Sequence, residues 1–202
     1  IQEITPELAE SFGLPGTDGA LISDIEPGSP ADKAGLKKGD VILKFNGVTI
    51  SEMKELPAVV AMTPVGDRAV ITVFREGVMK DISVLIGEMP DETMVGAAPS
   101  TPGTGPGVDD ADVGIVVEEV TSEISQYLGL PDTSGVLVSQ VETGSFAERA
   151  GILRGDVIRE INHKKITSLD DFTREMAEAQ KMGRYLFLIW RNGTTIFIAI
   201  NT

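Results

Sequence analysis

Hydrophobic residues alternate with polar ones along several short stretches of this chain. Residues 20–25 and 136–141 alternate in this way, which is typical of strands that bury one face. We expect further strands at residues 1–4, 41–45, 69–75, 78–85, 115–120, 157–161, 185–191 and 194–200. Two hairpins are predicted near the ends of these stretches, and Asn192-Gly193 is the strongest turn signal in the chain.

Other segments have the signals of short helices. Residues 6–12 and 122–128 each stand between a threonine placed to cap a helix and a glycine placed to end it. Ser29 and Ser145 are expected to cap one-to-two-turn helices, and Ser51 and Ser168 to open a longer helix in each half. One face of each longer helix is apolar, and we expect most of that face to be core. These apolar residues are Met53, Leu56 and Val60 in the first half, and Leu169, Phe172 and Met176 in the second.

The same elements occur twice because the sequence itself is repeated. The run from Gly28 to Ile42 returns from Gly144 to Ile158, a shift of 116 positions, and the same shift aligns Arg75 with Arg191. We therefore expect two copies of one domain, mainly β with short helices (α+β). Each copy is predicted to have five to six strands and two to three helices, in a partly open β-sandwich or barrel. The predicted boundaries are 1–88 for the first domain, 89–111 for a linker and 112–202 for the second domain.

The predicted linker is rich in proline and glycine between Ala97 and Gly107, and we expect it to be mobile and extended. Its Gly103-x-Gly105-x-Gly107 pattern superficially resembles a phosphate-binding loop, but no strand precedes it and no helix follows. Acidic residues come next, and we expect a solvated acidic run rather than a cation site there. These residues are Asp109, Asp110 and Asp112.

Composition narrows the class of partner. The net charge of −14 argues against nucleic acid or an anionic membrane surface. No apolar run approaches the roughly 20 residues of a membrane span. The chain has no cysteine, which excludes disulfides, iron–sulfur clusters and thiol catalysis but does not reveal the compartment.

Nothing in the sequence predicts a catalytic centre, a metal site or a cofactor. The single histidine, His163, is expected in a solvated turn without a partner for general base catalysis. Asp40 and Asp156 are predicted to be turn residues that bond nearby amides. The Gly-x-Ser-x-Gly nucleophile turn and the His-Glu-x-x-His zinc motif are both missing.

The repeated segment resembles a known signature. Gly28-x-x-Ala31-x-x-Ala34-Gly35-Leu36-x-x-Gly39-Asp40-Val41-Ile42 and its twin are similar to the central signature of bacterial PDZ domains. Glu7-Leu8-Ala9 before Gly13-Leu14 resembles the tandem PDZ region of HtrA/Do-type serine proteases. This resemblance implies an upstream trypsin-like protease domain, oligomeric assembly through it, a bacterial periplasmic location and a role in protein quality control.

The resemblance also implies a peptide site in each copy. An extended peptide would add as a strand in the groove between a strand and the longer helix, with its terminal carboxylate held by backbone amides. Val113-Gly114-Ile115 matches the hydrophobic-Gly-hydrophobic carboxylate loop of the family. The expected peptide-binding residues of the second domain are Val113, Gly114, Ile115, Val116 and Val117 in the loop and strand, and Leu169, Phe172 and Met176 on the helix.

The first copy is expected to keep only part of such a site. The shift carries Gly114 to a position before Ile1, so we expect free C-termini to bind there weakly or not at all. The remaining candidates are Ile1, Gln2, Glu3 and Ile4 on the strand, and Met53, Leu56 and Val60 on the helix.

These expectations favour a non-catalytic segment that captures C-termini or extended segments of misfolded proteins and regulates a protease and its assembly. Two tethered sites would raise the effective concentration of a long unfolded chain. Three alternatives stay open: a scaffold or sorting protein without a protease, a module that docks onto the PDZ domains of neighbouring subunits, and a segment of a membrane metalloprotease.

Overall fold

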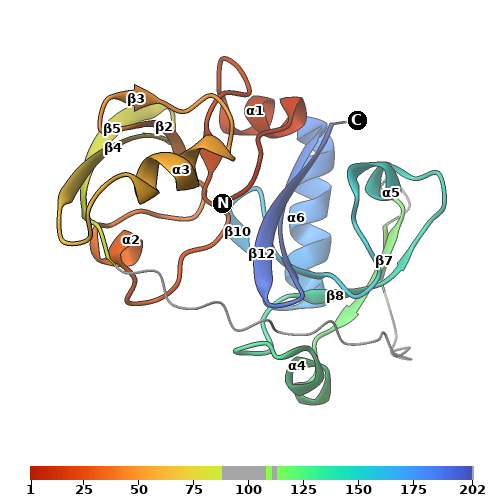
Figure 1. Cartoon of the computed structure of the whole chain (residues 1–202). Coiled ribbons are helices and arrows are strands. Elements are labelled where there is room, and N and C mark those ends of the chain that lie inside the picture. The colour runs from red at the N-terminus through yellow and green to blue at the C-terminus, as the bar shows by residue number, and fades with distance from the viewer. Residues whose placement is uncertain (88–107, 111–112, 202) are drawn as a thin grey trace. The chain divides into compact units, whose positions relative to one another are not determined.

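The chain forms two compact units, one within Ile1–Thr93 and the other within Met94–Thr202. The computed structural model describes residues 1–87, 108–110 and 113–201 (Figure 1). Both units are antiparallel sheets with short helices, which confirms the predicted mainly β fold with two domains. Most of the predicted linker, its Gly103-x-Gly105-x-Gly107 pattern and Asp112 lie outside the described residues.

The first unit is built on a sheet with the strand order β1-β2-β4-β5, in which β3 pairs with β2. Within the described residues this sheet has five strands. Its elements are α1 (Pro6–Phe12), β1 (Ala20–Leu21), α2 (Pro30–Lys33), β2 (Val41–Phe45), β3 (Val48–Thr49), α3 (Glu55–Ala61), β4 (Arg68–Arg75) and β5 (Val78–Leu85).

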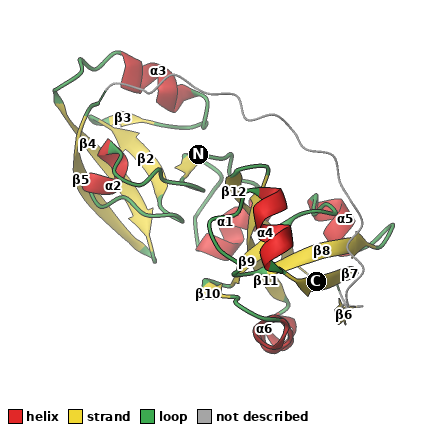
Figure 2. Ribbon diagram, turned by 90° about the horizontal axis from the view of Figure 1, so that it is seen from below, coloured by secondary structure: helices red, strands yellow, loops and turns green. Residues whose placement is uncertain are grey.

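The second unit repeats this plan with longer pairing. Its sheet has the order β12-β11-β9-β8-β7-β6, with β10 beside β9, which makes seven strands among the described residues. The elements are β6 (Val108–Asp110), β7 (Ile115–Glu119), α4 (Ser122–Leu128), β8 (Val136–Val141), α5 (Phe146–Ala150), β9 (Val157–Ile161), β10 (Lys164–Lys165), α6 (Leu169–Met182), β11 (Arg184–Arg191) and β12 (Thr194–Asn201). Figure 2 shows the strands in yellow and the helices in red.

The predicted helix ends of α1 and α4 are confirmed. The hydroxyl of Thr5 accepts a hydrogen bond from the Leu8 amide, and Thr121 accepts one from Ile124. Gly129 ends α4 with φ of 68°, in the left-handed region that glycine enters without steric cost. Both predicted hairpins are also present, β4 with β5 and β11 with β12.

The prediction that Ser51 opens a helix is wrong, because α3 begins only at Glu55. Pro57 explains the later start. A proline is tolerated in the first turn of a helix but would break a backbone hydrogen bond further inside. The carboxylate of Glu55 instead accepts hydrogen bonds from the amides of Ser51 and Glu52. In the second unit Ser168 caps α6 as predicted, with its hydroxyl accepting from the Asp171 amide.

Two predicted strands of the first unit are shorter than expected. Residues 1–4 contribute one isolated bridge, in which the amides and carbonyls of Gln2 and Leu21 bond at 2.7 and 3.0 Å. Of residues 20–25 only Ala20 and Leu21 form strand β1, which pairs with β2 alone among the named strands. In the second copy β9 likewise pairs only with Val136 and Leu137, and the longer β8 is explained by its pairing with β7 as far as Val141.

A buried ion pair joins distant segments in each unit. Asp40 accepts the predicted hydrogen bond from the Lys37 amide, and it also forms a two-point contact with the Arg75 guanidinium at 2.6 Å. Asp156 and Arg191 repeat this arrangement at 2.7 and 2.6 Å. We did not predict the arginine partners, although both members of each pair recur at the same shift in the sequence. The pair ties the turn before β2 or β9 to the end of β4 or β11.

Candidate functional site

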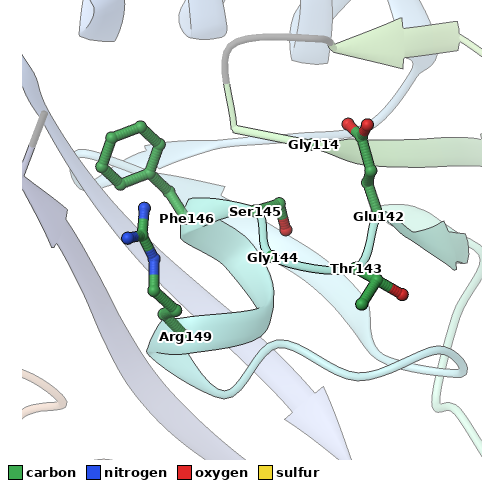
Figure 3. A pocket seen from close by; sticks show the side chains of 7 residues that line it. All are labelled: Gly114, Glu142, Thr143, Gly144, Ser145, Phe146 and Arg149. Carbon is green, nitrogen blue, oxygen red and sulfur yellow. The ribbon is translucent and has the colours of Figure 1, made fainter.

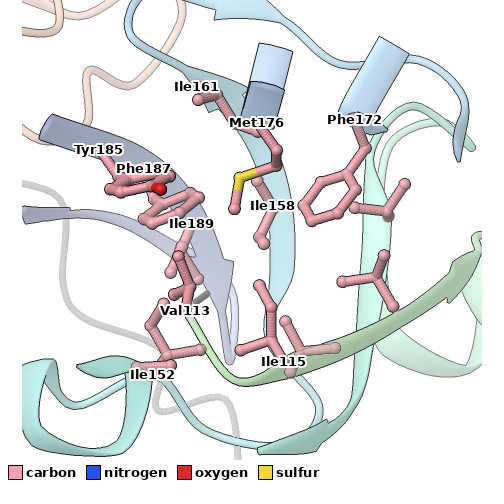
Figure 4. Close-up of a cluster of buried hydrophobic side chains, with 14 of the residues drawn as sticks. Val113, Ile115, Ile152, Ile158, Ile161, Phe172, Met176, Tyr185, Phe187 and Ile189 are labelled. Carbon is pink, nitrogen blue, oxygen red and sulfur yellow. The ribbon is translucent and has the colours of Figure 1, made fainter. Parts of the chain in front are cut away.

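The β7 strand and the α6 helix of the second unit pack onto the same hydrophobic cluster (Figure 4). From the loop and β7 come Val113, Ile115 and Val117, which are at most 1% exposed. From α6 come Phe172 and Met176, at 0% and 3%. The structure therefore brings these five predicted site residues together, with their side chains mainly in the core.

The remaining predicted residues of this site are more accessible. Leu169, the first residue of α6, is half-buried and packs against the edge of the cluster. Val116 is also half-buried, and it alternates with the inward-facing Ile115 and Val117 along β7. Of the three predicted α6 residues, Leu169 is consequently the one whose substitution would disturb the core least.

The loop before β7 requires glycine at position 114. Gly114 has φ of +80°, and a Cβ atom there would lie 2.4 Å from Cβ of Ser145. Two carbonyl groups hold the loop in place, since that of Val113 accepts from the Ala147 amide and that of Gly114 accepts from the Glu142 amide. The loop is thus fixed against the start of α5 through its carbonyl oxygens.

The amides of this loop point to another part of the chain. In a trans peptide the N–H group lies opposite the carbonyl of the preceding residue. Accordingly the Gly114 N–H donates to the backbone carbonyl of Asp110 at 2.8 Å. The Val113 N–H donates to the side-chain carboxylate of Asp110 at 3.2 Å. The predicted carboxylate loop therefore binds oxygen atoms in this structure, and they belong to an aspartate of the same chain.

Strand β6 covers the outer edge of β7. Its register pairs Val108 with Val117, Asp109 with Val116 and Asp110 with Ile115. Because β8 pairs with the opposite edge of β7, the β6 side is where an additional strand could be accommodated. From the sequence, residues 108–110 are expected in the linker, because the strand signal there is limited to a single apolar residue, Val108, before two aspartates.

An open pocket of about 260 Å³ lies on the other side of the loop, at the start of α5 (Figure 3). The Arg149 guanidinium lies 4.6 Å from the centre of the Phe146 ring, and Glu142 supplies a carboxylate. The loop presents its carbonyls to this side, so the pocket is not the place where its amides would bind an anion. The lining residues are Gly114, Glu142, Thr143, Gly144, Ser145, Phe146 and Arg149.

The first turn of α6 is held by Asp171. Its carboxylate accepts hydrogen bonds from the hydroxyl and the amide of Thr167, at 2.5 and 3.1 Å, and from Arg174 at 2.6 Å. These contacts favour the charged form and lower the pKa of Asp171 from 3.8 to about 2, with the Thr167 hydroxyl as the largest cause. They fix the end of the helix that carries Leu169.

The first unit has a less developed version of this arrangement. Leu56 is buried in its core cluster, with Met53 and Val60 packed at the margin. Ile4 is buried, whereas Ile1 is 47% exposed and Glu3 is also exposed. Gln2 makes the single bridge to Leu21.

The described residues hold no cluster of three or more histidine, cysteine, aspartate or glutamate side chains placed to bind a metal ion. His163 lies in the turn between β9 and β10 with φ of 64°. Over the same part of the chain, we find no helix that combines the length and the apolar character needed to span a membrane.

Comparison with known proteins identifies both units. Models of the PDZ domain match residues 5–86 and 137–182. A probable periplasmic serine endoprotease DegP-like from Marinomonas sp. (strain MWYL1) is 38% identical over 199 residues, which is 98% of this chain and 40% of that protein. A protein of the same description from Hahella chejuensis (strain KCTC 2396) is 39% identical over 202 residues, 99% of this chain and 42% of that protein.

The chain was also compared with solved structures. An HtrA-type protease AlgW with decapeptide is 34% identical and covers 45% of this chain and 28% of that chain, with a TM-score of 0.42. The chain spans only about 40% of the length of the curated relatives it matches. The chain belongs to the PDZ domain family, as a tandem of two PDZ domains homologous to the PDZ region of DegP-like HtrA serine proteases.

Proposed function

We propose that the second PDZ domain captures C-termini or extended segments of misfolded proteins by adding them as a strand to β7. The bound segment runs antiparallel to β7, beside α6, and its carboxylate is held by the amides of Val113 and Gly114. Main-chain pairing provides affinity with little dependence on sequence, which suits a module that receives many different unfolded chains. Leu169 supplies the accessible apolar contact at the start of α6.

One observation carries this proposal. The outer edge of β7 already pairs with an extended segment, β6, and the amides of Val113 and Gly114 already donate to oxygen atoms of its last residue, Asp110. The geometry needed for strand addition is therefore supported by contacts within the chain. Gly114 supports the same assignment, because any side chain there would collide with Ser145.

We further infer that the tandem is the regulatory part of a serine endopeptidase, delivers substrates to its protease domain and influences its assembly. The naming of the relatives as probable periplasmic DegP-like endoproteases supports this role and a periplasmic location. Neighbouring PDZ domains of other subunits are a second class of partner, since they could present an extended edge to the same groove.

Peptide titration tests the binding function. We expect the full chain to bind a labelled peptide that ends in Ala-Val-Val with a free carboxylate, as followed by fluorescence anisotropy. The same peptide with an amidated C-terminus should bind about tenfold more weakly, because a charged hydrogen-bond acceptor is lost. Leu169→Ala should weaken binding of the free acid. Met182→Ala is the matched control, since it removes a 57% exposed side chain from the opposite end of α6.

Equal affinity for the acid and the amide would contradict carboxylate capture by the loop. An equal effect of the two α6 substitutions would contradict a groove at the start of the helix.

A further inference from the structure

The outer edge of β7 is occupied by the chain's own residues 108–110, and this occupation follows the pattern expected of a peptide ligand. Strand β6 is antiparallel to β7, and its last residue, Asp110, lies opposite Ile115 at the loop end of β7. A peptide with its C-terminus in the loop would run in the same direction. The direction of β6 and the position of its acidic end therefore both match those expected of a bound peptide.

The chemistry of the contacts agrees as well. Asp110 presents a carboxylate oxygen to the Val113 N–H and a carbonyl oxygen to the Gly114 N–H, at 3.2 and 2.8 Å. These two amides are the donors that a terminal carboxylate would need. Two residues earlier, the side chain of Val108 packs against the cluster that contains Phe172 and Met176. An aliphatic side chain followed two positions later by a carboxylate thus occupies the site.

We propose that Val108–Asp110 is an internal ligand of the second PDZ domain, which an incoming peptide must displace. The inference rests on the proposed function and adds to it the identity of the competitor. The displacing ligand is an extended segment that places an aliphatic side chain where Val108 lies and a carboxylate where that of Asp110 lies. Peptides that lack either group replace fewer of these contacts and should therefore bind more weakly.

Displacement lowers the measured affinity for a peptide. Only two residues separate Asp110 from Val113, so β6 competes at a high effective concentration. The apparent dissociation constant of a peptide rises in proportion as the fraction of open domain falls. Weakening β6 should therefore tighten peptide binding, and pinning β6 should abolish it.

An introduced disulfide can pin β6. Because the chain contains no cysteine, no other thiol competes with the introduced pair. Asp109 and Val116 are Cα partners across the two strands. Directly opposite residues of antiparallel strands have Cα atoms about 4.5–5.5 Å apart, within the range of a disulfide. The full chain carrying Asp109→Cys and Val116→Cys is titrated, oxidised and reduced, with the labelled peptide ending in Ala-Val-Val with a free carboxylate. Its reduced form controls for the substitutions, and wild type given the same oxidant controls for the treatment.

We expect the oxidised pair to bind at least about tenfold more weakly than its reduced form. A second variant acts in the opposite direction. Asp110→Asn removes the charge from the internal ligand, and it should bind the peptide about threefold or more tightly than wild type. Hydrogen exchange of residues 108–110 in the wild type should also become faster when the peptide is added.

The outcomes separate this inference from the proposed function. Equal binding by the oxidised and reduced pairs would overturn the internal ligand and would also show that the peptide does not pair with the outer edge of β7. Unchanged or weaker binding by Asp110→Asn would overturn the role assigned to its carboxylate. If the wild type, the reduced pair and Asp110→Asn all fail to bind, the proposed function is overturned and the internal ligand with it.

Discussion

Gly114 is the residue on which the carboxylate loop depends. Its φ of +80° and the 2.4 Å approach of a built Cβ to Ser145 act together, so a side chain is excluded both by backbone conformation and by space. Gly193, in the β11–β12 turn, has a similar φ of +88° but nothing within 4 Å of its Cβ position. Comparing substitutions at the two glycines therefore separates the cost of the backbone conformation from the cost of the contact with Ser145.

We expect Gly193→Ala to lower the free energy of unfolding by about 1–2 kcal/mol, the cost of a left-handed conformation for a residue with a Cβ. Gly114→Ala should cost more, because Ser145 or the loop must also move. It should in addition weaken binding of the free-acid peptide, which Gly193→Ala should leave unchanged. Denaturant unfolding and peptide titration measure both quantities. Equal stability losses would show that the contact with Ser145 relaxes freely.

Asp171 makes the stability of the second domain sensitive to acid. Its pKa is about 2 in the folded chain against 3.8 for the ordinary group. The stabilisation it provides is therefore complete above pH about 4 and is lost as the pH falls toward about 2. Asp171→Asn should lose less stability than wild type when thermal unfolding is compared between pH about 5 and pH about 2.

At the scale of elements, α6 contributes to the core and to the proposed groove with different residues. Phe172 is fully buried, whereas Leu169 is half-buried at the start of the helix. Phe172→Ala should lower the free energy of unfolding by about 3–5 kcal/mol, as is usual for a buried phenylalanine. Leu169→Ala should cost clearly less and act mainly on peptide affinity. The comparison requires unfolding curves and titrations of both variants, and a larger stability loss in Leu169→Ala would contradict this division.

Element positions were predictable where local signals agree with tertiary pairing. The bounds of α1, α4, β2 and β9 followed from caps, glycines and hydrophobic pattern, and the repeat gave an independent second reading of each. The start of α3 is not predicted by the capping signal of Ser51, because Pro57 favours a helix in which it stands in the first turn. Strand β6 was missed for another reason: its pairing depends on the position of β7, and three residues with one apolar side chain have too little pattern to predict a strand.

The sequence locates the elements of the site but does not show which of their side chains are buried. The loop and the helix were located by resemblance, but sequence pattern could not separate Leu169 from Phe172 and Met176, since all three lie on the same helical face. Burial decides between them, and burial depends on how closely α6 packs against β7, β9 and β11.

At the scale of the whole molecule, each domain contains its own copy of the same buried ion pair, Asp40 with Arg75 in the first and Asp156 with Arg191 in the second. Asp40 is 0% exposed and Asp156 is 1% exposed, so each buried carboxylate has its charge compensated by an arginine and not by solvent. Arg75→Leu or Arg191→Leu should each lower stability by about 3–5 kcal/mol, because an unpaired buried charge remains. Each loss should fall on the domain that carries the substitution, as measured by hydrogen exchange resolved along the chain. A loss in the other domain would contradict this assignment.

The two domains differ mainly in what surrounds the strand beside the longer helix. In the second, β7 is a five-residue strand paired on both sides, whereas residues 1–4 of the first form a single bridge. We therefore assign peptide capture first to the second domain, with β6 as the segment that an incoming peptide replaces.

The proposed function requires that an extended peptide with a free carboxylate pairs with β7. Nuclear magnetic resonance of the isotope-labelled full chain during peptide titration tests it most directly. We predict the largest shifts at the amides of Val113, Gly114 and Ile115, together with Leu169, and the loss of the β6–β7 contacts. Shifts confined to the pocket around Phe146 and Arg149, or to residues 1–87, would show that the peptide does not pair with β7.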